Sequence, residues 1–168
     1  MKHSTSFFLL ALLLGLPGGA HAALSCTVPS GVSMPFPTYD DSSAATNDFA
    51  VPLAVSCCRT GVPNPTVGTI TITIGVSANS NQVNTRQMKN TANADLMSYQ
   101  LYINSYGGTV WGDVTHGGSA YTQNVSISTR CAPRQAVAVG SNIYGRIFAQ
   151  QPVSAGNYAD TLTISITP

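Results

Sequence analysis

The chain has 168 residues and few charges: seven Lys or Arg stand against six Asp, Glu is absent, and the formal net charge is +1. A surface with so little positive charge has no field to hold phosphate, so we expect neither nucleic acid nor an anionic membrane as a partner. Glu and Lys are scarce whereas Thr, Val, Ile, Ser, Asn and Gly abound, and this balance favours an all-β fold over helices.

The N-terminal residues have the pattern of an export signal. Basic residues 2–3 precede an apolar run at 7–16, residues 17–19 are Pro-Gly-Gly, and residues 20–22 are Ala-His-Ala. This order predicts a signal peptide over residues 1–22. The run is too short for a membrane-spanning helix, which needs about 20 apolar residues. We therefore expect one exported domain over residues 23–168, without membrane insertion.

Several later stretches alternate between apolar and polar residues with period two, which predicts β-strands. In chain order they cover residues 49–58, 68–76, 96–104, 123–130, 135–150 and 160–168. In the first two, one face collects the apolar side chains of Val51, Leu53, Val55 and Cys57, and of Ile70, Ile72 and Ile74. We expect these faces to form the core.

The segments between the predicted strands are rich in Gly, Pro, Asn and Ser, as surface turns are. They cover residues 60–68, 77–84, 104–108, 112–119 and 151–158. Residues 37–48 form the longest polar stretch, which predicts a loop between the first two strands. Strands at this spacing indicate a β-sandwich.

Four cysteines in an exported chain, Cys26, Cys57, Cys58 and Cys131, predict two disulfides, for which sequence alone allows three pairings. Neighbouring residues of a strand point to opposite faces, so Cys57 and Cys58 should have different partners. We favour Cys26 with Cys57 and Cys58 with Cys131. A zinc site has little support, because no Cys-x-x-Cys occurs and only one histidine follows the predicted signal.

No catalytic or cofactor site is evident. The lone histidine, His116, lies in a Gly-rich stretch without a Gly-x-Ser-x-Gly motif, which favours a solvated loop residue over a catalytic base. The aspartates are scattered over predicted turns, where capping roles are expected, and the glycines lack a phosphate-binding loop pattern. We expect no enzyme, metal or cofactor. These aspartates are Asp40, Asp41, Asp48, Asp95, Asp113 and Asp160.

One binding function from a different class stays open. Tyr106, Trp111 and Tyr121 lie in or beside Gly-rich segments, where exposed rings could form a platform for a sugar. The alternative hypothesis is therefore a secreted carbohydrate-binding β-sandwich module.

The ordered set of local motifs resembles the spore coat protein U domain family, which includes subunits of archaic chaperone–usher pili. The resemblance covers nearly all of the chain after the predicted signal. Its most specific elements are Arg-x-Met at 86–88, Trp-Gly at 111–112, Tyr-Gly-Arg-Ile at 144–147 and Gly-x-Tyr-x-Asp-Thr at 156–161. They are accompanied by the stretches at 53–57, 69–75, 84–90, 96–104, 109–113, 143–151 and 155–166.

This resemblance implies an immunoglobulin-like sandwich that lacks its last strand. A periplasmic chaperone would lend a strand to the open groove, and at the outer-membrane usher the N-terminal extension of another pilus subunit would replace it. The protein would then pass through the periplasm to a pilus, or fimbrium, on the cell surface. Cys58 and Cys131 are additions to the family's usual single bridge. A coat or matrix protein outside a pilus is the alternative within the same structural class.

The resemblance further implies a place at the pilus tip. Shaft subunits carry a donor extension before the first cysteine, but only Ala23, Leu24 and Ser25 lie between the predicted cleavage point and Cys26. Three residues reach about 10 Å, too little to span several pockets. Tip subunits are adhesins, although those of the family usually have two such domains and we expect one here.

An adhesin holds apolar groups at its surface, and two loops are candidates. Met34 and Phe36, with Pro35 and Pro37, form the first, and Val62 with Pro63 forms the second. The competing interpretation is that Met34 and Phe36 belong to the core of the first strand.

Overall fold

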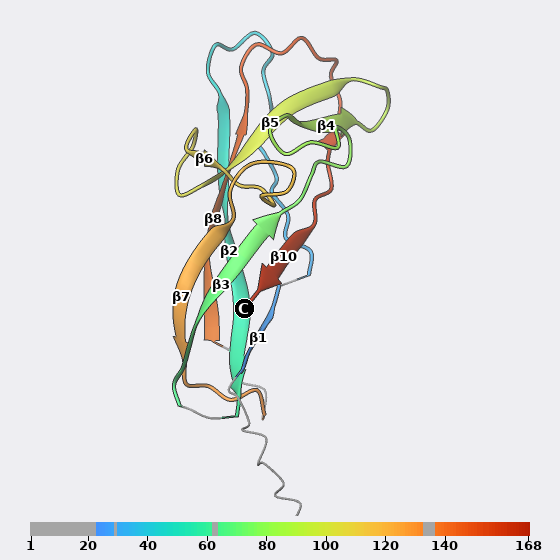
Figure 1. Cartoon of the computed structure of the whole chain (residues 1–168). Helices are drawn as coiled ribbons and strands as arrows, with labels where there is room; N and C mark the ends of the chain where they lie inside the picture. The colour runs from blue at the N-terminus through green and yellow to red at the C-terminus, as the bar shows by residue number, and fades with distance from the viewer. Residues whose placement is uncertain (1–22, 29, 62–63, 133–136) are drawn as a thin grey trace, which may run out of the picture.

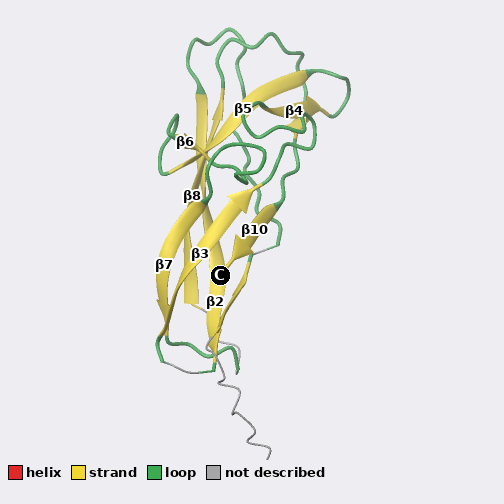
Figure 2. Ribbon diagram, in the orientation of Figure 1, coloured by secondary structure: helices red, strands yellow, loops and turns green. Residues whose placement is uncertain are grey.

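The computed structural model describes residues 23–28, 30–61, 64–132 and 137–168, which form only strands and loops (Figure 1, Figure 2). The strands make two sheets that enclose one apolar core. The predicted all-β sandwich is confirmed. The predicted signal peptide, residues 1–22, lies outside the described residues.

Within the described ranges the larger sheet contains seven strands, all paired antiparallel. From one edge to the other the order is β1 (Ala23–Thr27), β2 (Asn47–Thr60), β8 (Val137–Ile147), β5 (Leu96–Ile103), β4 (Arg86–Asn90) and β9 (Tyr158–Ala159), and β6 (Thr109–Val110) also pairs with β5. The smaller sheet has the order β10 (Ile164–Thr167), β3 (Thr66–Ile74) and β7 (Tyr121–Ile127).

The core lies where the sequence pattern places it. Leu53, Val55 and Cys57 of β2 are at most 1% exposed, and the three predicted isoleucines of β3 are equally buried. Because side chains of a strand alternate between faces, the intervening serine and threonines of these strands point outward. Burial of these two faces against each other is the main apolar stabilisation of the sandwich.

Several boundaries differ from the expectations: β7 covers 121–127 rather than 123–130, and β10 covers only 164–167 of the predicted 160–168. The predicted loop 37–48 ends earlier, because β2 begins at Asn47, where β8 supplies partners and Arg146 Nε donates to Asp48 Oδ1 at 2.7 Å. The residues before Cys26, which the alternation did not assign to a strand, belong to β1, because β2 extends to Thr60 and Ala23 pairs opposite it. The short strands β4, β6 and β9 were not predicted, since two to five residues carry little periodicity.

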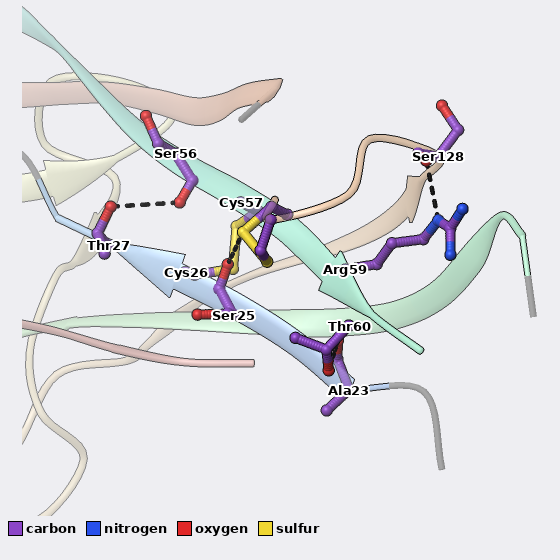
Figure 3. Close-up of a disulfide and its surroundings, with 11 residues drawn as sticks. Ala23, Ser25, Cys26, Thr27, Ser56, Cys57, Arg59, Thr60 and Ser128 are labelled. Carbon is purple, nitrogen blue, oxygen red and sulfur yellow. Dashed lines mark hydrogen bonds between the residues drawn. A yellow bond between two sulfur atoms is a disulfide. The ribbon is translucent and has the colours of Figure 1, made fainter. Parts of the chain in front are cut away.

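Two disulfides fasten β2 near its C-terminal end, and Figure 3 shows the one between Cys26 and Cys57. Cys26 of β1 bonds to Cys57, which lies directly opposite in the β1–β2 ladder. Cys58 points to the other face and bonds to Cys131, whose N–H donates to Arg59 O at 3.1 Å. These are the two pairs favoured from the sequence.

Peptide mapping of the non-reduced protein should recover Cys26 linked to Cys57 and Cys58 linked to Cys131. The two adjacent cysteines must be separated by a non-specific protease or by fragmentation in the mass spectrometer, because no common cleavage site lies between them. A fragment that joins Cys26 to Cys58, or a free thiol at Cys131, would contradict the arrangement.

Candidate strand-acceptor groove

A long groove opens between the two sheets on one side of the sandwich. It consists of two hollows of about 630 and about 480 Å³. Both are lined by Met34, Pro35, Phe36, Met88 and Tyr158, so they are continuous. One wall is the extended segment after β1, and the other is the C-terminal segment that contains β9 and β10.

The first wall, residues 30–39, has no backbone partner strand. No backbone hydrogen bond joins residues 30–36 to another strand within the described chain. Its side chains alternate instead: Val32, Met34 and Phe36 are half-buried, whereas Pro35 and Pro37 are exposed. A proline also restrains the residue before it to an extended conformation, which explains why this unpaired segment stays straight.

A glycine of the larger sheet makes room for this wall. A Cβ added to Gly145 of β8 would lie 2.6 Å from Phe36 Cζ and closer still to Met34 Sδ. No other residue type leaves that space, so Gly145 lets Met34 and Phe36 pack flat on the sheet. Side-chain packing therefore holds residues 32–36 of the wall, and beyond them Asn47 Nδ2 donates to Pro37 O at 3.1 Å and to Thr38 O at 3.0 Å.

The second wall changes sheets along its length. Tyr158–Ala159 pairs with β4 of the larger sheet, and Ile164–Thr167 pairs with β3 of the smaller one. Between them, Thr161 O and Thr163 O accept the N–H groups of Ala78 and Gly75. β10 is the last strand of its sheet in the described structure, so its groove-facing edge has no partner.

Tyr99 connects the two walls across the floor of the groove. Its ring packs edge-on against Phe36, with centroids 6.2 Å apart, and its hydroxyl donates to Asp160 Oδ2 at 2.7 Å. The other carboxylate oxygen of Asp160 accepts the N–H of Ala78 at 3.0 Å and Asn79 Nδ2 at 3.1 Å. Burial and then the bond to Asp160 raise the pKa of Tyr99 above its usual value, so the hydroxyl stays a donor.

A buried arginine lies beside the floor. Arg86 is fully buried, and Nη2 donates to the carbonyl oxygens of Ile74, Gly75 and Trp111 at 2.8–3.1 Å. Nη1 donates to Gln100 Oε1 at 2.7 Å. Burial lowers the pKa of Arg86 from its usual value, while Tyr99 acts in the opposite direction. Through these hydrogen bonds Arg86 links β4 to the ends of β3 and β6, and so it stabilises the strands that form the floor of the groove.

Two of the candidate adhesive residues line the groove. Met34 and Phe36 are half-buried against Gly145 and Tyr99 in the extended segment after β1, and they do not belong to the first strand as the competing interpretation had it. Val62 and Pro63 lie outside the described residues.

The predicted sugar platform is not assembled. Trp111 is completely buried, and its Nε1 donates to Ile72 O at 3.0 Å, so its ring cannot meet a ligand at the surface. Tyr121 packs against this buried ring, with centroids 5.5 Å apart, and Tyr106 packs on Tyr144 instead. Gly-rich flanks predict an exposed loop, but in this fold they allow close packing around Trp111.

His116, Asp113 and Asp40 serve local turns, whereas Asp48, Asp95 and Asp160 bond to residues that are distant in the chain. His116 Nδ1 lies 2.7 Å from Asp113 Oδ2 at the exposed end of a loop, and Asp40 accepts from Ser42. Over the described ranges no group of three or more His, Cys, Asp or Glu side chains could hold a metal ion. The same residues contain no helix that is long and apolar enough to cross a membrane.

Sequence reasoning missed the residues that shape the groove. The alternation at 32–37 is visible in the sequence, but the run is short and interrupted by prolines. Arg86, Gly145 and Asp160 lie in the motifs that carry the family resemblance. Those motifs indicate that the residues matter but do not indicate what each residue does. Tyr99 was seen only as a member of an alternating strand.

One comparison with known proteins, the family match, agrees with the sequence motifs. The pattern of the Spore Coat Protein U domain matches residues 14–165. No curated protein matches the chain. A similar solved structure is described as "Chaperone-tip adhesin complex is vital for synergistic activation of CFA/I fimbriae biogenesis", with 14% identity and a TM-score of 0.48. The match covers 86% of this chain and 41% of that one. With nearly all of its strands inside the matched range, the chain belongs to the Spore Coat Protein U domain family.

Proposed function

We propose that the protein is a non-enzymatic subunit of a chaperone–usher pilus and that its groove accepts a strand from another protein. The observation that carries the proposal is an apolar groove between two chain segments whose facing backbone edges are unpaired. An added strand with alternating apolar side chains would pair with both edges and fill both hollows. It would also protect an edge that otherwise invites aggregation.

The order of partners follows from the family resemblance. A periplasmic chaperone would fill the groove first, and a neighbouring pilus subunit would replace it at the outer-membrane usher. The pattern of residues 1–22 supports export through the periplasm, and the destination would be a surface fimbrium that serves cell adhesion and biofilm formation. Neither a nucleic acid nor a cofactor has a part in this function.

A place at the tip is the finer part of the proposal. Ala23–Thr27 pair with β2 in register, and Cys26 is bonded to Cys57, so these residues are not free to enter a neighbour's groove. A subunit that receives a strand without giving one can occupy only one end of a head-to-tail filament. Its partners would then be a chaperone, the usher and one following subunit.

Periplasmic yield tests the main proposal. Expressed alone, the protein should aggregate or be degraded, because the open groove lowers a stability margin that is normally about 5 to 15 kcal/mol. Co-expression with the chaperone of its own operon should give a soluble 1:1 complex. Abundant monomer with a cooperative unfolding transition, obtained without any chaperone, would contradict the proposal.

Polymer formation tests the tip assignment separately. The chaperone complex should exchange its strand for a peptide of a companion subunit's N-terminal extension, yet it should give no multimers by itself. A graft of about 15 such residues ahead of Cys26 should permit self-assembly or self-complementation. A charge at one inward position of the graft should abolish this, since it would be buried unpaired. SDS-resistant ladders from the unmodified protein would overturn the tip role alone.

A further inference from the structure

Residues 32–37 of the first wall have two lateral backbone edges, which differ in their hydrogen-bond donors. Pro35 and Pro37 have no N–H group, whereas Val32, Met34 and Phe36 retain theirs. Which edge loses its donors depends on the direction in which each amide points, and that direction can be worked out from β1.

In β1, the amides of core-facing residues point away from β2. Cys26 and Cys57 are directly opposite, with Cα atoms 4.1 Å apart. That separation fits a non-hydrogen-bonded antiparallel pair, at about 4.5 Å, rather than a hydrogen-bonded one at about 5.5 Å. The N–H and C=O of Cys26, and those of Leu24 on the same face, therefore point away from β2, while those of Ser25 point toward it.

Beyond β1 the chain keeps its direction (Figure 1), and its contacts place it in the opposite layer. Met34 and Phe36 pack on the inner face of the larger sheet at Gly145, which alternates with the core residues Ile143 and Ile147. Their side chains thus point back toward the larger sheet, whereas Leu24 and Cys26 point away from it. The turn at residues 30–31, with Gly31 at φ 73°, separates the two parts.

This change of layer reverses the amide direction. In an extended chain of L-residues, chirality links the chain direction, the side-chain direction and the sideways direction of the amide. If the side chains reverse while the chain direction stays the same, the amides therefore also reverse. The amides of Val32, Met34 and Phe36 therefore point in the direction that runs from β1 across β2 and β8 toward β4. The groove lies on that side of the wall, because the wall packs on Gly145 of β8 and the far lining comes from Met88 of β4 and Tyr158 of β9.

We propose that residues 32–37 form a one-sided pairing edge. The N–H and C=O groups of Val32, Met34 and Phe36 bind the backbone of the incoming strand, and Pro35 and Pro37 deny donors to the opposite edge. Prolines protect exposed strand edges in this way, because a strand without N–H groups cannot extend a ladder. The inference rests on the proposed function, since it assigns the residues that hold the accepted strand.

Residue-resolved amide exchange of the full chain, bound to a synthetic companion-extension peptide, tests the assignment. The amides of Val32, Met34 and Phe36 should exchange at least about 100-fold more slowly than that of Ser33. Protection of Ser33 with free exchange at Met34 would overturn the proposal. Protection along β10 without any at 32–36 would also overturn it, and would leave the proposed function standing. Failure of the peptide to bind at all would instead count against the proposed function.

Proline substitutions provide a matched test. Ser33→Pro removes an N–H that faces away from the groove, so peptide affinity should stay within about twofold of the wild type. Met34→Pro should bind at least about tenfold more weakly than Met34→Ala, which loses the same side chain but keeps the amide. Equal damage by the two proline variants would overturn the assignment. If Met34→Pro does not fold, the exchange pattern of the wild type decides.

A separate variant tests whether Pro35 and Pro37 protect the outer edge from pairing. In the peptide-bound protein, replacement of both Pro35 and Pro37 by threonine restores N–H groups on the outer edge, and sedimentation should then show association beyond the 1:1 complex. Persistence of a strict 1:1 complex at high concentration would show that these prolines do not guard the edge.

Discussion

Replacement of Arg86 by alanine should abolish stable folding even when a donor strand is supplied. The change removes all four hydrogen bonds of the guanidinium and leaves the buried carbonyls of Ile74, Gly75 and Trp111 without this partner. Each buried acceptor left without a partner costs about 1 to 3 kcal/mol, and the truncated side chain also leaves a cavity, so the total is a large part of an ordinary stability margin. Denaturant unfolding of the peptide-complemented protein measures the free energy directly.

Two further variants control this experiment. Lys89→Ala, on the exposed face of the same strand, should change the unfolding free energy by less than about 0.5 kcal/mol. Arg86→Lys keeps the charge but has three donors on one atom for four acceptors at different angles, so it should recover only part of the loss. A change below about 1 kcal/mol in Arg86→Ala would mean that the carbonyls find other partners.

Gly145→Val should weaken strand binding far more than it lowers the stability of the complemented fold. The added atoms would occupy the space of Met34 and Phe36, so the first wall must lift from the sheet and the groove loses its width. Overpacking of this kind costs about 1 to 3 kcal/mol, which corresponds to about 5- to 150-fold in the peptide dissociation constant. Titration of a fluorescent companion-extension peptide measures this constant.

A double-mutant cycle supplies the control for Gly145. Gly145→Ala should be damaging in the wild-type background and less so when Met34 is also alanine, because the shorter side chain no longer reaches the new Cβ. Unchanged peptide affinity in Gly145→Val would indicate that the wall already lies away from β8 once the groove is filled.

The fold class and the core followed from the sequence because the determining signals are local. The alternation at 49–58 and at 68–76 fixes which side chains of β2 and β3 meet, and the adjacency of Cys57 and Cys58 fixes opposite directions for two bridges. Burial of Leu53, Val55 and the isoleucines of β3 needed no knowledge of their partners, only of the period.

The groove did not follow from the sequence, because it is defined by missing pairings. Periodicity at 32–37 and at 158–166 predicts extended chain, but it does not reveal that both segments change layers or that their facing edges stay open. The prediction that Trp111 is exposed was wrong for a related reason. A neighbouring glycine permits either exposure or very close packing of the ring, and only the tertiary structure determines which occurs. Gly145 and Tyr99 shape the groove through contacts with Phe36, 109 and 63 residues away in the chain.

The bond between Cys26 and Cys57 has a mechanical consequence in the proposed filament. Tension would reach this subunit through the strand held against residues 32–36, and from there it would pass down the chain to β1. Peeling β1 from β2 would normally require breaking only a few hydrogen bonds, one after another. The covalent cross-link stops such peeling at Cys26, and the neighbouring bond from Cys58 to Cys131 carries the load on to the segment that follows β7. A subunit at the end of a fibre that grips a surface under flow would thus bear shear through covalent bonds at the point where its sheet is otherwise easiest to open.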